Sequence, residues 1–179
     1  MPSPIAHSVS GYVIGKFLPI EISKYYHSRW WKLENFYPVF VAIFADFDFL
    51  PQLITGQNFH RGITHTLIFA VGFSLVLALL VSCLCKSSFK QLFLFTLIIY
   101  SSHLVLDLFT TGGSGLQILW PLTDTYFKST ISIFPQVHHS QGLFDISHLI
   151  FIMWELSYSI LILSILWLWK TCCSSKFPE

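Results

Sequence analysis

The chain has 179 residues, of which 54% are hydrophobic and only 11% are charged. Because a soluble domain carries about 25% charged residues, this composition argues against a soluble fold and predicts that the lipid bilayer is the solvent. Ten lysines and arginines balance nine acids, which excludes broad electrostatic binding of nucleic acid. The eight histidines are unusual beside so few charges and indicate metal or proton chemistry.

Two apolar segments open the chain and carry a few charges. Residues 5–20 contain Lys16, and residues 36–54 contain Asp46 and Asp48. We expect each segment to cross the bilayer or to dip into it under the cover of the others. We also expect the first segment to be retained, because no basic residue precedes it and no cleavage motif typical of a signal peptide follows it.

Three longer segments follow and each can span a bilayer. Residues 62–85 and 91–106 contain no Lys, Arg, Asp or Glu, and residues 146–169 are interrupted only by Glu155. The first of these runs reaches roughly 36 Å as a helix, against a hydrocarbon core of about 30 Å. The sequence therefore predicts an all-α, polytopic transmembrane helical bundle. It has three spanning helices, up to five apolar helical segments and one membrane-embedded domain over residues 1–179.

Basic residues set the predicted orientation. Lys86 and Lys90 lie in the short loop between the first two spans, so this loop is expected in the cytoplasm. The same topology places eight of the ten basic residues inside, and only Arg61 and Lys128 outside. It also gathers the acids and nearly all histidines at the opposite, extracytoplasmic face, although the topology was drawn from lysines and arginines alone.

The histidines and acids at this face come from four segments. His103 and Asp107 are four residues apart on a predicted helix, so their side chains share a face and can chelate one divalent metal. A plain hydrogen bond between the two remains an alternative. His60 is expected in a loop and His65 on the following helix, where an interfacial polar cap is the alternative to ligation.

Two acids separated by one residue, Asp46 and Asp48, lie near the end of the second segment among apolar neighbours. One could ligate a metal while the other orients a histidine or activates water. With His7 from the first segment, the candidates suit zinc, manganese or iron, bound as one or two ions. The predicted ligands are His7, His60, His65, His103 and Asp107. The predicted catalytic residues are Asp46, Asp48 and Arg61, whose guanidinium can bind a phosphate oxygen bidentately.

Four sequence runs, ADFDFLP, HRGITHTL, SSHLVLDLFTTGG and ILWPL, lie in a region from roughly Ala6 to Leu122, about two thirds of the chain. They resemble the YdjM-like family of inner-membrane-associated metal-dependent hydrolases. The resemblance carries over to His7, the two acids, the His60–His65 motif and the His103–Asp107 pair. It also carries over to Thr64 and Thr110 in second-shell or capping roles. Ala45 and Phe49 depart from the family pattern, which has proline and often histidine there.

The resemblance implies a membrane-bound metal-dependent hydrolase. Its expected substrate is a phosphoester or phospholipid at the extracytoplasmic face of a bacterial inner membrane, with membrane lipid as the partner. The order of His and Asp on helices is also similar to that of zinc-dependent phospholipase C enzymes. Two other classes remain open: a transport protein that moves metal ions or protons past Glu155, and a membrane protein in which a metal only staples the helices.

Overall fold

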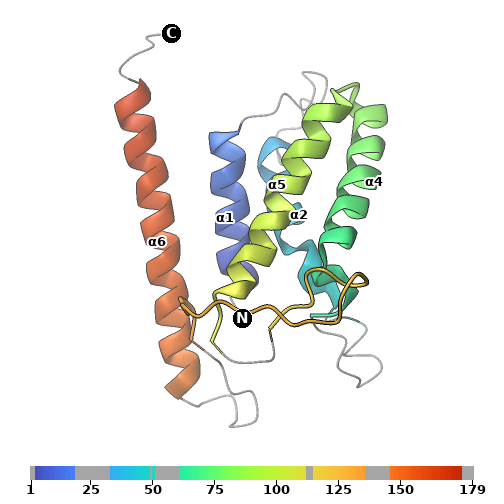
Figure 1. Ribbon diagram of the computed structural model, residues 1–179. Helices are drawn as coiled ribbons and strands as arrows, with labels where there is room; N and C mark the ends of the chain where they lie inside the picture. Colours follow the sequence, from blue (N-terminus) through green and yellow to red (C-terminus); the bar gives the residue numbers. More distant parts are fainter. Residues whose placement is uncertain are drawn as a thin grey trace.

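The computed structural model describes residues 3–18, 33–48, 50, 61–111, 115–135 and 146–174 (Figure 1). Its described elements are all helical, and the only β pairing among them is two isolated bridges. The elements are α1 (Pro4–Phe17), α2 (Leu33–Ile43), the 3₁₀ helices η1 (Phe44–Asp48) and η2 (Ile63–His65), α4 (Leu67–Cys85), α5 (Phe89–Leu108) and α6 (Ile146–Ser174).

Three of these helices are long and apolar enough to cross a membrane: α4, α5 and the Ile146–Cys172 part of α6. The predicted all-α bundle with three spanning helices is thus confirmed. With 14 and 11 residues, α1 and α2 extend about 21 and 17 Å. Each is shorter than the roughly 30 Å hydrocarbon core, so neither helix is long enough to cross the core by itself.

Helix α4 begins later than the sequence predicted. Thr66 is its N-cap, and the Thr66 hydroxyl accepts a hydrogen bond from the backbone amide of Phe69. This cap satisfies an amide that would otherwise lack a partner in the first helical turn. His65 therefore lies in the 3₁₀ turn before the helix, which corrects the expectation that it belongs to the helix itself.

The two short helices approach each other closely through glycines. A side chain at Gly11 would meet the Cβ of Ala42 at 2.5 Å and the carbonyl oxygen of Pro38 at 2.6 Å. Gly15, one turn further along α1, faces the Pro38 ring in the same way. Small residues four apart let helices in membranes pack backbone to backbone, and here they bring α2 against α1.

Helix α6 packs along α1 and lies away from α4 (Figure 1). Three contacts along α1 define this interface: both the backbone amide and the hydroxyl of Ser3 bond to the carboxylate of Glu155, Ser10 bonds to Tyr158, and the Phe17 ring packs on Trp169. Glu155 is almost fully buried, and Ser3 is the N-cap of α1. A carboxylate at this position compensates both the unpaired amides and the positive end of the helix dipole.

The helix directions separate the two ends of the molecule. Helices α1, α4 and α6 begin at the lower end in Figure 1, where α5 ends. A segment after α5 runs across this lower end. It is tied to the helices by hydrogen bonds from the amide of Leu67 in α4 to the carbonyl of Ile118 and from the amide of Ser129 to the carbonyl of Leu108 in α5.

Candidate metal centre

The cluster of histidines and acids is built around the last two turns of α5. His103 and Asp107 lie on one face of this helix, with the His103 Nε2 4.0 Å from the Asp107 Oδ2. Both side chains are buried, with residue exposures of 1% and 3%. The predicted shared face of the pair is therefore present, although the 4.0 Å separation is too long for the direct hydrogen bond that was the alternative.

A backbone carbonyl fixes the orientation of His103. Its Nδ1 lies 2.7 Å from the carbonyl oxygen of Ala42 in α2. A carbonyl only accepts hydrogen bonds, so Nδ1 carries the proton and Nε2 presents a lone pair to the interior of the cluster. A metal-binding histidine usually donates its other ring N–H in this way.

A carboxylate orients His65 in a similar way. Asp48 Oδ2, from η1, lies 3.1 Å from the His65 Nδ1 and accepts hydrogen bonds from the Thr64 hydroxyl and the Arg61 amide. Arg61 adopts a left-handed conformation with φ of 64°, and this turns its amide toward the carboxylate. The His65 Nε2 then faces the His103 Nε2 at 3.3 Å and the Asp107 Oδ2 at 3.3 Å.

The pKa of His65 indicates that this geometry favours a positive charge within the cluster. Burial acts most strongly on the His65 pKa and lowers it, but hydrogen bonds and charge attraction from Asp107 and Asp48 together outweigh burial and raise the pKa from 6.5 to about 9. Lone pairs of two imidazoles and a carboxylate thus meet at one point, where a positive charge is required. A proton on His65 can supply that charge, and a metal ion that binds there must displace the proton.

His7 and Asp46 complete the cluster from two further elements. His7, in the first turns of α1, stacks on the His103 ring with 3.7 Å between centroids and places its Nε2 3.5 Å from the Asp107 Oδ1. Asp46, in η1, lies with its Oδ1 3.6 Å from the His103 Nε2. Four separate parts of the fold therefore contribute: α1, η1, η2 and α5.

The spacing of these atoms fits a metal ion. Ligand atoms about 2.0–2.1 Å from a tetrahedral metal lie about 3.3–3.4 Å from one another. Four of the distances that link the cluster are 3.3, 3.3, 3.5 and 3.6 Å, and the fifth, between the His103 Nε2 and the Asp107 Oδ2, is 4.0 Å. Among the described residues, the buried ring nitrogens of His7 and the buried oxygens of Asp107 form no hydrogen bond of ordinary length and angle. The Asp107 oxygens instead lie in ion-pair contacts, 3.5 Å from the His7 Nε2 and 3.3 Å from the His65 Nε2. Such buried atoms are costly unless a cation or an unobserved donor satisfies them.

Two groups of side chains could each hold an ion, and they share one residue. The first group is His7, His103 and Asp107, and the second is Asp46, His65 and His103. Because the single lone pair of the His103 Nε2 can bind only one metal, the two groups describe one ion between them more naturally than two separate ions. Three imidazoles and a carboxylate suit zinc, and an additional carboxylate suits manganese or iron.

The structure also separates the roles of residues that the sequence grouped together. Asp48 lies outside both candidate ligand groups and instead holds His65. Arg61 is half-buried beside Asp48, and its Nε is buried without a hydrogen bond among the described residues. The predicted ligand His60 lies outside the described residues, as do His138, His139 and Asp145 of the later loop. Sequence reasoning missed the carbonyl of Ala42, since a backbone group leaves no residue-type signal.

Comparisons with known proteins agree with this picture. The inner membrane protein YbcI of Escherichia coli (strain K12) is 37% identical over 68 residues, which cover 38% of this chain and 39% of that protein. The aligned part thus spans about two fifths of the relative's length, and no solved structure matches the chain. Residues 1–176 match the family model described as YdjM inner membrane protein. The predicted family is therefore confirmed: the chain belongs to the YdjM family and is an integral inner membrane protein.

Proposed function

We propose that this protein is a metal-dependent hydrolase that cleaves a phosphoester, with a membrane phospholipid as its expected substrate. The observation that carries this proposal is the convergence of ligand atoms from α1, η2 and α5 on one buried point, at spacings that fit a metal, with the Asp46 carboxylate of η1 beside them. A protein that needed only to hold its helices together could do so with apolar packing, without burying several ionisable groups.

The residues at the rim of the cluster suit the chemistry. Asp46 has 14% of its side chain exposed and adjoins His103, so it is the better general base: it would take a proton from the attacking water as the water oxygen bonds to phosphorus. The ester P–O bond breaks, and the leaving alkoxide takes up a proton from solvent. The buried Nε of Arg61 is a donor suited to a phosphate oxygen. When bound, a divalent metal supplies Lewis-acid polarisation of a phosphoryl oxygen and lowers the pKa of water.

The proposed site faces the extracytoplasmic side. Among the described basic residues, Lys16, Lys86, Lys90 and Lys170 lie near the helix ends far from the cluster, whereas Arg61 and Lys128 lie at the cluster end. The excess of lysine at the far end supports a cytoplasmic location for that end by the positive-inside rule. Because the cluster lies at one end of the spanning helices, it would lie close to the lipid headgroups of that membrane face.

The first test is metal content. Purified wild-type protein should retain close to one equivalent of zinc, manganese or iron after dialysis, measured by elemental analysis. His65→Ala and Asp107→Ala should retain much less, because each removes an atom that faces the proposed ion. Asp124→Asn, which changes an exposed acid in the loop after α5, should retain the wild-type amount. Equal metal in all four proteins would refute the shared site.

The second test is turnover. Wild-type protein with added zinc or manganese should release a labelled product from a bacterial lipid extract, and Asp46→Asn should release far less while retaining its metal. Metal binding without any product would favour a structural staple. Ion flux in liposomes that is lost in Glu155→Gln, again without product, would favour transport.

A further inference from the structure

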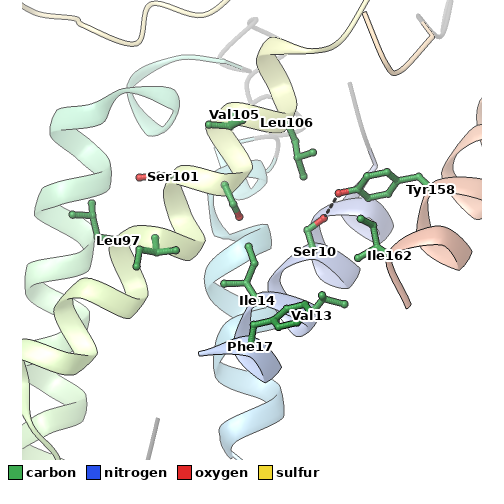
Figure 2. A pocket seen from close by; sticks show the side chains of 12 residues that line it. Ser10, Val13, Ile14, Phe17, Leu97, Ser101, Val105, Leu106, Tyr158 and Ile162 are labelled. Atoms are coloured by element: carbon green, nitrogen blue, oxygen red, sulfur yellow. Dashed lines mark hydrogen bonds between the residues drawn. The ribbon is translucent and has the colours of Figure 1, made fainter. Parts of the chain in front are cut away.

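An apolar groove of about 690 Å³ lies between α1, α5 and α6 (Figure 2). Helix α1 forms its floor and α5 and α6 form its walls, because α6 packs on α1 and stands apart from α5. The lining side chains include Val13, Phe17, Leu97, Val105, Tyr158 and Ile162. The groove is separate from the metal cluster, and none of the functional residues described above lines it.

Three of the four hydroxyl groups that line the groove are already satisfied by the protein. The Ser10 hydroxyl donates to the carbonyl of Ala6 and pairs with the Tyr158 hydroxyl, both at 2.7 Å (Figure 2). The Ser102 hydroxyl donates to the carbonyl of Ile99 in its own helix. These bonds leave the wall with no free hydroxyl at Ser10, Ser102 or Tyr158, so it suits hydrocarbon better than a polar ligand.

The groove runs along the helices rather than across them. On α5 its lining extends from Leu97 to Leu106, about 14 Å of helix. Since α5 is one of the spanning helices, this length lies within the hydrocarbon core. Val105 and Ile98 at its edge are about half exposed, so the groove opens toward the surface that meets lipid.

One end of the groove adjoins the metal cluster. Ser102 precedes the candidate ligand His103 in the chain, and Leu106 precedes Asp107. Ser10 is one helical turn from His7 on α1. A chain of hydrocarbon lying in the groove would therefore have one end at the depth of the cluster and the other toward the middle of the bilayer.

We propose that this groove binds one acyl chain of a membrane phospholipid and so selects long-chain lipids as substrates. The selection of substrates rests on the proposed hydrolase function, but the binding of an acyl chain in the groove does not depend on that function. The occupant is a lipid rather than a second protein copy. The groove is apolar, lies along a spanning helix, and ends at the level of a cluster suited to the phosphate that every phospholipid carries.

Photocrosslinking tests the occupant directly. The full-length protein is placed in bilayers with a phosphatidylglycerol that carries a diazirine near the middle of one acyl chain, irradiated and mapped by peptide mass. Label should concentrate on groove residues of α1, α5 and α6 over the exposed face of α4. Even labelling of both surfaces would overturn the proposal, as would a bifunctional crosslinker that joins two copies of the protein across the groove in a parallel sample.

Two substitutions of the same type provide a matched pair. Val105→Phe narrows the groove, and Val76→Phe adds the same volume on the exposed surface of α4. Crosslinking to the groove should fall about tenfold in Val105→Phe and remain at the wild-type level in Val76→Phe. Ser102→Phe, deeper along the same helix, should repeat the loss. Equal labelling in all of these proteins would overturn the proposal.

Metal content and a water-soluble phosphodiester separate this inference from the proposed function. Val105→Phe should keep its metal and its rate on the soluble diester, but lose about tenfold in kcat/KM on long-chain lipid. If no protein turns over any substrate while label still concentrates in the groove, the hydrolase proposal fails and the lipid site stands. If the wild-type protein cleaves short-chain and long-chain lipids with equal kcat/KM and the crosslinked label is spread evenly over both surfaces, the lipid site alone is refuted.

Discussion

Two acids that are nearly adjacent in the chain do different work in the cluster. Asp46 and Asp48 are two residues apart in a 3₁₀ helix, where each residue advances the side chain by about 120°, so the two carboxylates point in different directions. Asp46 approaches His103, whereas Asp48 holds His65 together with the Arg61 amide. The sequence predicted both acids at the site. It did not predict which one would orient a histidine, since that depends on the helix type at a frayed end.

Removing the Asp48 charge should weaken metal binding without abolishing it. Asp48→Asn keeps the side-chain size but loses the carboxylate that fixes the His65 ring. Loss of such a partner typically lowers metal affinity about 10–100-fold. Competition with a zinc-binding dye would measure the change, and Asp124→Asn is the control with the same substitution at an exposed position. Unchanged affinity in Asp48→Asn would mean that another group orients His65.

At the scale of the helices, the sequence predicted the long spanning helices well, because their length and hydropathy suffice to identify them. It predicted the ends and contacts of the short helices less well, because these depend on packing. Three long apolar runs became three spanning helices. The two shorter runs, residues 5–20 and 36–54, contain α-helices that end at Phe17 and Ile43. A hydropathy pattern does not distinguish the 3₁₀ helix over Phe44–Asp48 from an α-helix. The spacing Gly11-x-x-x-Gly15 is typical of close helix packing in membranes and could have predicted the α1–α2 contact, which was not among the predictions.

Gly11 should be far less tolerant of a methyl group than Gly72. Gly11→Ala places a Cβ 2.5 Å from the Cβ of Ala42 and 2.6 Å from a backbone oxygen of α2, so the two helices must separate at a cost of about 1–3 kcal/mol. Gly72→Ala meets nothing within 4 Å on α4 and gains helix propensity. Thermal unfolding in detergent should show a lower Tm for Gly11→Ala and an unchanged or higher Tm for Gly72→Ala. Equal Tm values for the two would mean that the helices are not in close contact.

Glu155 illustrates how a buried acid in a spanning helix can be structural. Its carboxylate binds both the amide and the hydroxyl of Ser3 at the start of α1, the helix that carries His7. Glu155→Gln should therefore lower the free energy of unfolding by about 1–3 kcal/mol. The glutamine side chain has only one acceptor oxygen for the two Ser3 donors, and it has no negative charge to balance the positive end of the α1 dipole. The Tm and the retained metal would report this loss. A variant with wild-type Tm but altered ion flux would contradict the capping role.

At the scale of the whole molecule, most of the described lysines lie at one end of the helices and the cluster of histidines and acids lies at the other. The convergence of four segments on one site followed from a topology drawn with lysines and arginines, and the described helix directions place the described cluster residues at one end. The packing distances that distinguish ligands from supporting residues did not follow from the sequence. They depend on tertiary contacts such as those of the Ala42 carbonyl and the Asp48 carboxylate.

The orientation of the molecule gives the last prediction. In a cysteine-free background, Ser88→Cys lies between Lys86 and Lys90, and Thr125→Cys lies in the exposed loop at the cluster end. Because the lysine-rich end is expected in the cytoplasm, a membrane-impermeant maleimide should label Thr125→Cys in intact spheroplasts and Ser88→Cys only after permeabilisation. Both positions are exposed and polar, so each serves as the control for the other's reactivity. The reverse pattern would place the cluster of histidines and acids on the cytoplasmic side and overturn the proposed orientation.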